Sequence, residues 1–298
     1  MIDIYNSSIS VFQVDSLLAR KAYNELDNFL IEYDTTSDVS KKICAIYFSG
    51  HSIYYPNTEV ALNNNIFIKN RFEWYRQRVP EATKHIFVRD IHKQWYLSGI
   101  NISLNSPELL LSFLRNETVG YEIVCIGSSA GGYAALLYGS LLNAKVIHAF
   151  SPRIYMQSLD TTSDESKNPL YFRLKNTTRK KYFDISQFII SSKAEIYCYY
   201  PIYSNLDKLQ LNHIYNSRME HNENFHLIKF KTKKHGVPFP KIALDRIISI
   251  TYPISITQKV QIPIFFSIKQ VGLVKTLQGI LNQIKKYIRI KTNALFKL

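Results

Sequence analysis

The sequence CIGSSAGGYAALLYG, which spans residues 125–139, places the densest group of small residues in the chain between an apolar run and a stretch of helical character. Its centre, GSSAGG, covers residues 127–132. One explanation is a tight turn that packs a helix closely against a strand. The other is a turn that holds a serine in an exposed position. The residues around this turn have to decide between the two.

Residues 127–131 match the pattern G-x-S-x-G, with Ser129 as the central serine. Glycine is needed two positions before and two positions after, because side chains would collide in so sharp a passage from strand to helix. Ser129 is the only serine with glycine at both offsets, so Ser128 is a spacer. A P-loop would continue with Gly-Lys-Ser/Thr and a dinucleotide fingerprint would read G-x-G-x-x-G, and neither fits. The pattern predicts that Ser129 is a nucleophile.

Short apolar runs alternate with helical patterns on both sides of this turn, as expected for strands buried on both faces of a sheet. The alternation predicts an α/β fold: a mostly parallel sheet flanked by helices, with an insertion after the sixth strand and a C-terminal basic amphipathic helix. We predict strands over residues 11–14, 43–48, 85–90, 122–127, 145–150, 195–200 and 226–230, and helices over 106–116, 132–144 and 205–219.

Two segments break the alternation. Residues 151–192 are polar and rich in turn residues, which indicates an insertion or lid. No acidic residue follows Asp245, while lysine and arginine accumulate, so we expect a catalytic domain over 1–257 and a helical tail over 258–298. The basic amphipathic pattern of 269–291 predicts contact with an anionic membrane surface, and packing on the protein's own core or on a second subunit is the alternative.

A serine hydroxyl needs a base, and the base needs an acid that orients it. When the serine stands on such a turn, the acid and then the histidine follow along the chain. Of the histidines beyond the turn, only His235 comes directly after a strand end, in a loop fixed by Gly236 and Pro238, so we predict it to be the base. The other histidines are expected elsewhere: His148 in the core, His213 and His221 in solvated positions, and His226 at the start of a strand.

For the acid we predict Asp207, which follows the strand that precedes the strand of the histidine. The alternative for Asp207 is a favourable interaction with the positive end of its own helix. The rival acids are Asp160, Asp164, Asp184 and Glu195. For the oxyanion we expect the backbone N–H of Ala130 and a donor from Gly50 or His51, in the loop after an earlier strand. His51 could instead contact substrate, or be a solvated loop residue.

The formal net charge of +14 suits an anionic partner such as a membrane surface or an acidic glycan, and it also fits a composition rich in Lys, Asn, Ile and Tyr. No nucleic-acid motif is recognisable, so no nucleic-acid partner is expected. The three cysteines lie in apolar runs and are expected to be buried thiols. No spacing indicates a metal site. Without a signal pattern or an apolar run of about 20 residues, we expect a cytoplasmic protein, at most peripheral to the inner membrane face.

The stretches GSSAGG, NLD (205–207) and HGVPF (235–239), in this order, resemble the α/β-hydrolase superfamily over about residues 40–245. FVRDIHKQWYLSGI (87–100), YYPIYSNLDKLQ (199–210) and KKHGVPF (233–239) resemble members found in bacterial capsule and surface-polysaccharide gene clusters. Some of these are O-acetyltransferases that use acetyl-CoA. The resemblance implies a triad of Ser129, Asp207 and His235, and acetyl-CoA as a co-substrate. SGHS (49–52) stands where lipases often carry HGGG.

These observations lead to the hypothesis of a serine enzyme that transfers an acyl group, either an esterase or an O-acetyltransferase. It is expected to act on a small-molecule or glycan ester, and the resemblance implies a bacterial surface glycan. No bound cofactor is expected. The alternative is a non-catalytic accessory protein that uses the same scaffold to bind a glycan or partner proteins. The acyl donor and the acceptor stay open.

Overall fold

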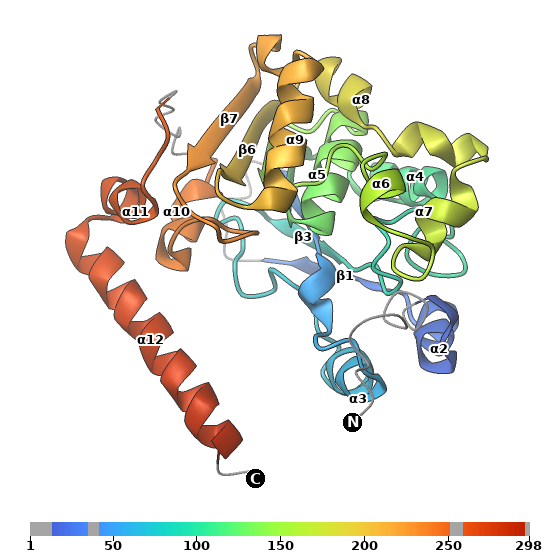
Figure 1. The fold of residues 1–298 in the computed structure, drawn as a ribbon, viewed down its shortest axis with the longest axis horizontal. Helices are drawn as coiled ribbons and strands as arrows, with labels where there is room; N and C mark the ends of the chain where they lie inside the picture. Colours follow the sequence, from blue (N-terminus) through green and yellow to red (C-terminus); the bar gives the residue numbers. More distant parts are fainter. Residues whose placement is uncertain (1–13, 35–41, 251–258, 296–298) are drawn as a thin grey trace.

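The computed structural model describes residues 14–34, 42–250 and 259–295, and within them a seven-stranded sheet forms the centre (Figure 1). The strands are β1 (Phe29–Tyr33), β2 (Ile43–Phe48), β3 (Lys84–Val88), β4 (Glu122–Ser128), β5 (Val146–Phe150), β6 (Glu195–Pro201) and β7 (Phe225–Phe230). They lie in the order β1-β3-β2-β4-β5-β6-β7. β1 is antiparallel to β3 and every other neighbouring pair is parallel, which confirms the predicted fold class.

Helices connect and cover the strands. The longer ones are α2 (Leu17–Glu25), α4 (Pro107–Glu117), α5 (Ala130–Leu141), α9 (Asn205–Asn216), α11 (Pro263–Val271) and α12 (Leu273–Leu295). The shorter ones are α3 (Glu59–Leu62), α6 (Leu159–Thr162), α7 (Pro169–Leu174), α8 (Ser186–Ile190) and α10 (Leu244–Ile247). Short 3-10 helices form η1 (His51–Ile53), η3 (Thr178–Tyr182), η4 (Met219–His221) and η5 (Lys241–Ala243), and a π-helix forms η2 (Asn63–Ile68). The helices predicted over 106–116, 132–144 and 205–219 correspond to α4, α5 and α9.

The six predicted strands from residue 43 onward coincide with β2 to β7 to within two residues. The prediction over 11–14 is wrong at Val14, which is helical, and its other residues lie outside the described part of the chain. β1 was not predicted. It is an edge strand with no fully buried residue, and its sequence FLIEY directly follows a helical pattern. The insertion over 151–192 follows β5, which is the fifth strand and not a sixth, since β1 replaces the strand predicted over 11–14 and the number of strands before the insertion stays at five.

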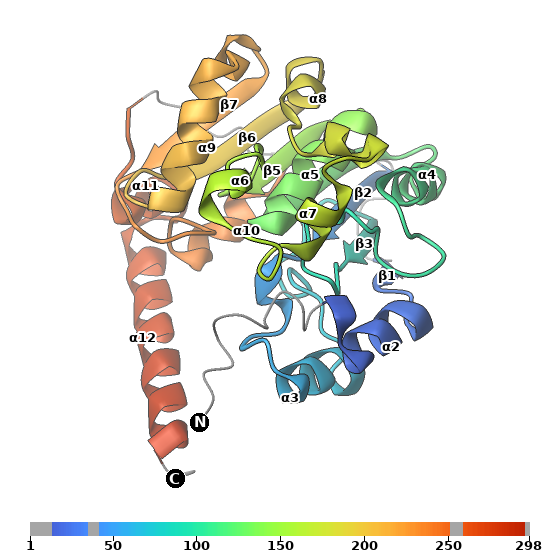
Figure 2. The same cartoon turned by 45° about the vertical axis from the view of Figure 1, so that its right-hand side comes forward.

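Helices lie on both sides of the sheet (Figure 2). A core lies on each face, because successive side chains of a strand point to opposite sides. Phe48 of β2 joins the core beneath α4, α5, α8 and α9. Its neighbour Tyr47 joins the core beneath η5, α10 and α11. Burial on both faces explains why the central strands have continuous apolar sequences, and it leaves the carboxyl ends of the strands free to carry a site.

The predicted C-terminal helix consists of α11 and α12, which Gly272 separates with a φ of 83°. The predicted domain boundary at residue 257 lies outside the described residues. Thr276 and Gly279 of α12 pack against the body, where a Cβ at position 279 would lie 2.7 Å from Ile242. Beyond this contact α12 extends away from the rest of the protein (Figure 1). No helix in the described ranges is both long and apolar enough to cross a bilayer.

Candidate active site

The turn between β4 and α5 holds Ser129 in a conformation that side chains rarely adopt, with φ 57° and ψ −118°. The glycines around it leave no room for a side chain. A Cβ at Gly127 would lie 1.9 Å from the carbonyl oxygen of Gly131, and one at Gly131 would lie 2.1 Å from that of Phe48. The N–H of Ser129 donates to the carbonyl of Phe150 at 2.8 Å, which ties the turn to β5. The sequence pattern thus corresponds to a strained strand-turn-helix that presents one serine.

The loop after β7 brings His235 to this serine. Its Nε2 atom lies 2.9 Å from Oγ of Ser129. Gly236, with a φ of 88°, turns the loop, and Ser151 fixes it from the end of β5. The hydroxyl of Ser151 donates to the carbonyl of Gly236 at 3.0 Å and lies 3.1 Å from its N–H. The loop that carries His235 is therefore anchored to the end of β5 as well as to its own strand, β7.

Asp207, in the first turn of α9, holds the other side of the imidazole. Its side chain is 2% exposed, and its oxygens lie 2.9 and 3.1 Å from Nδ1 of His235. An ionised carboxylate only accepts hydrogen bonds, so Nδ1 carries the proton and Nε2 offers its lone pair to Ser129. The structure brings together the three side chains selected from the sequence, in a continuous chain of contacts.

Another serine, histidine and aspartate also meet, but in a different arrangement. Asp184, Ser186 and Ser217 all contact the same atom, Nε2 of His213, at 3.2, 2.8 and 3.3 Å. A relay needs the acid on one ring nitrogen and the serine on the other. This cluster, in which His213 also stacks on Tyr155 at 4.2 Å, therefore serves to hold the insertion against α9. The sequence predicted a solvated position for His213, which is wrong: the side chain is half-buried.

The remaining rival residues lie away from Ser129. His226 pairs with Glu195 at 2.7 Å across β6 and β7. His148 is buried and lies 3.0 Å from the hydroxyl of Tyr199, as expected for a core histidine. Asp164 contacts its own neighbours in the insertion. None of these residues lines the cavity beside Ser129.

The expected oxyanion donors differ in their availability. Within the described residues, the N–H groups of Ala130 and His51 donate to no other group. The N–H of Gly50 donates to Oε2 of Glu73 at 2.7 Å, so it is already occupied. A Cβ at Gly50 would lie 2.6 Å from the carbonyl oxygen of Ser128, which places the loop after β2 directly against the turn. The arrangement offers Ala130 and His51 as the free backbone donors.

A cavity of about 140 Å³ opens beside Ser129. Its lining residues are His51, Trp95, Ser129, Ser151, Pro152, Arg153, Leu206, Asp207, Gln210 and His235. Sequence reasoning missed Ser151, Arg153 and Gln210, and it noted Trp95 without a role. A signal was present for Ser151 and Arg153, since both directly follow the carboxyl end of a predicted strand.

The imidazole of His51 is neutral. Burial lowers its pKa to about 3, and the charges of Lys93, Arg153 and His235 lower it further. Its Nε2 atom is buried and has no hydrogen-bond partner in the described structure. The side chain of His51 therefore lines the cavity and is not simply a solvated loop residue. Across the described ranges, no three His, Cys, Asp or Glu side chains are grouped so that they could hold a metal ion.

The strand order, the serine on its strained turn, and the succession of serine, aspartate and histidine along the chain define an α/β-hydrolase fold. No protein-family model and no curated protein sequence matches the chain.

Among solved structures, the chain is similar to the capsule O-acetyltransferase of Neisseria meningitidis serogroup A, at 15% identity and a TM-score of 0.45, over 69% of this chain and 83% of that one. Another structure of that enzyme contains CoA, with 13% identity, a TM-score of 0.44 and the same coverage. Acetyl xylan esterase 1 from Thermoanaerobacterium sp. JW/SL YS485 matches at 13% identity and a TM-score of 0.39, over 67% of this chain and 70% of that one. Similarity at this level concerns the fold and says nothing about activity.

Proposed function

We propose that the protein is a serine enzyme that transfers an acyl group through an acyl-Ser129 intermediate. The observation that carries this proposal is the unbroken contact from Ser129 through His235 to buried Asp207, with 2.9 Å at each step. The alternative of a non-catalytic accessory protein leaves unexplained why a strained turn and a buried acid are both aimed at one imidazole.

In the proposed mechanism, His235 takes the proton of the Ser129 hydroxyl as Oγ attacks the carbonyl carbon of the acyl donor. Asp207 holds the imidazole in the required tautomer and stabilises its charged form. The N–H groups of Ala130 and His51 stabilise the oxyanion. His235 then gives its proton to the leaving group, and an acceptor hydroxyl repeats the sequence in reverse to release Ser129.

The size of the cavity favours a short acyl group. A volume of about 140 Å³ is close to that of a cavity that accepts benzene, which suits a short acyl group. We therefore propose an acetyl group, with acetyl-CoA or an acetyl ester as the donor. The acceptor is a glycan hydroxyl in an O-acetyltransferase and water in an esterase.

Intact-mass spectrometry tests this function. After brief exposure to p-nitrophenyl acetate or acetyl-CoA, the protein is expected to become heavier by one acetyl group, and peptide mapping is expected to place that group on Ser129. Release that requires an added oligosaccharide would assign a transferase, and release in buffer alone would assign an esterase. If neither donor acylates the protein, the proposed function is wrong.

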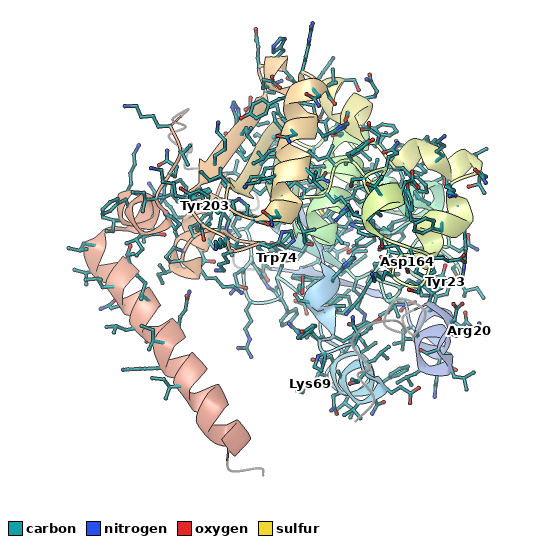
Figure 3. All side chains as sticks on the ribbon, viewed as in Figure 1. Arg20, Tyr23, Lys69, Trp74, Asp164 and Tyr203 are labelled. Atoms are coloured by element: carbon teal, nitrogen blue, oxygen red, sulfur yellow. The ribbon has the colours of Figure 1, made fainter. Side chains whose placement is uncertain are left out.

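We also propose that α12 attaches the protein to an anionic membrane surface at the inner face of the cytoplasmic membrane. Six apolar residues of α12 are between 49% and 67% exposed: Leu273, Val274, Leu277, Leu281, Ile284 and Ile288. Figure 3 shows side chains of this helix with no other element beside them. Thr276 and Gly279, which contact the body, lie on a different side of the helix. Beside this stripe, the tail from residue 259 onward carries lysine and arginine but no acid, which suits anionic lipid headgroups.

Removal of the residues after Gly272, which leaves the core helix α11 in place, is expected to abolish co-sedimentation with vesicles of phosphatidylglycerol, and binding of the full chain is expected to weaken with salt. The double change Leu281→Glu and Ile284→Glu is expected to have the same effect, because both side chains belong to the exposed stripe. Asn282→Glu, an exposed change off the stripe, is the matched control. Dimers that dissociate on truncation, with no vesicle binding, would show that the stripe faces a second copy instead.

A further inference from the structure

Arg153 is an unused cation in the cavity that contains Ser129. Its side chain is partly buried, and within the described residues it makes no hydrogen bond and no ion pair. Burial lowers its pKa, and Asp207 opposes this, but a guanidinium stays charged in proteins. Its five N–H donors have no acceptor in the described part of the protein and are partly removed from water. This costs free energy unless a ligand accepts hydrogen bonds from them. The guanidinium of Arg153 therefore needs a hydrogen-bond acceptor from a molecule that binds in the cavity.

Trp95 orients this guanidinium. The Cζ atom of Arg153 lies 5.3 Å from the centre of the indole ring, and the ring of His51 lies 5.1 Å from it on a tilted plane. The indole is only 6% exposed, so it forms a wall of the cavity. A cation over an aromatic face is attracted to the ring, which restricts the positions of the guanidinium and reduces the entropy lost when it binds a two-oxygen acceptor.

The protein itself fixes the conformation of the loop that carries Trp95, before any ligand binds. Lys93, Trp95 and Tyr96 all have positive φ, between 53° and 59°, which is rare for residues other than glycine. The buried carboxylate of Asp90 maintains this shape by accepting the N–H groups of Gln94 at 2.8 Å and Tyr96 at 2.9 Å. Backbone strain that the surrounding structure maintains is a mark of functional sites.

Charge in the cavity identifies the ligand chemistry. Of the groups that line it, Asp207 is committed to His235 and the imidazole of His51 is neutral. Arg153 therefore supplies the uncommitted charge. Because a cavity of about 140 Å³ holds roughly one small ring, anything bound to Arg153 lies within one sugar ring of Ser129.

We propose that Arg153, held over the indole of Trp95, binds a carboxylate or phosphate group of the substrate next to the site of acyl transfer. The chemistry is that of a planar fork binding two oxygens of an oxyanion. The oxyanion belongs to an acidic sugar that receives the acyl group, because the pantetheine arm of acetyl-CoA keeps its phosphates far from a thioester held at Ser129. This inference rests on the proposed role of Ser129, since it places the oxyanion relative to that residue.

Isothermal titration of the full chain with glucuronate, glucose 6-phosphate, CoA and glucose tests the proposal. We expect glucuronate or glucose 6-phosphate to bind 10-fold or more tighter than glucose. R153Q is expected to weaken that probe by about 10- to 100-fold and leave glucose unchanged, as loss of charged hydrogen bonds does. R153K, which keeps the charge but not the fork, should fall between. R115Q, an exposed arginine that does not line the cavity, is the control and should bind like wild type.

The arms of this experiment separate the sources of the oxyanion. Dependence on Arg153 for glucuronate or glucose 6-phosphate supports an acidic acceptor, whereas dependence for CoA alone overturns the proposal. If no anionic probe prefers wild type to R153Q, or if R115Q causes an equal loss, the proposal is overturned. Failure of the proposed function has a different readout: absence of fluorophosphonate labelling at Ser129, which this binding measurement does not require.

Discussion

Replacement of Ser129 by alanine is expected to lower kcat by about a millionfold and to abolish covalent labelling by a fluorophosphonate. The reason is that Oγ of Ser129 is the atom that lies 2.9 Å from Nε2 of His235, so no other hydroxyl is activated. The variant should melt at the wild-type temperature. The strain at φ 57° and ψ −118° affects any residue with a Cβ, and alanine keeps that Cβ.

Ser128→Ala is the matched control for this experiment. Ser128 ends β4, and its hydroxyl faces the loop at Gly236, 3.3 Å from the position of a Cβ there, rather than the imidazole. This variant should still be labelled. Labelling that persists in Ser129→Ala and maps to Ser128 would show that the wrong serine of the pair was selected.

The central part of the fold was accessible from the sequence because local and tertiary requirements agree there. Strands β2 to β7 are buried on both faces, so their apolar runs are unbroken. The glycines at 127 and 131 are each required by a backbone atom within 2.1 Å of a would-be Cβ, so the pattern is a direct consequence of the turn. Chain order then selected Asp207 and His235, since the carboxyl ends of parallel strands meet at one edge.

The rest depends on contacts between distant parts of the chain. Glu73 accepts a hydrogen bond from the N–H of Gly50 although 23 residues separate them, and no local sequence pattern predicts this contact. Trp95 reaches the cavity through a run of positive φ that forms around the buried carboxylate of Asp90 rather than through glycines. β1 pairs with β3, about 55 residues away, at an edge where burial is too slight to leave a pattern.

Changes at His235 and Asp207 are expected to be strongly non-additive with the loss of Ser129. His235→Ala alone should lower kcat nearly as far as Ser129→Ala, and the double variant should be no worse, because a base without its nucleophile has nothing to activate. Asp207→Asn should cost about 10⁴-fold. An amide at this position can donate to Nδ1, which moves the imidazole proton to Nε2 and removes the lone pair that faces Ser129.

Steady-state kinetics with an acetyl ester on the single and double variants measure this coupling. His226→Ala is the control, because His226 also pairs with an acid, Glu195 at 2.7 Å, but lies on β7 away from the cavity. It should retain turnover near that of wild type. The triad assignment fails if His235→Ala keeps its turnover while a variant of another histidine loses it. It also fails if the losses at Ser129 and His235 multiply, because independent contributions are what two unconnected residues would show, and the 2.9 Å contact between them requires the opposite.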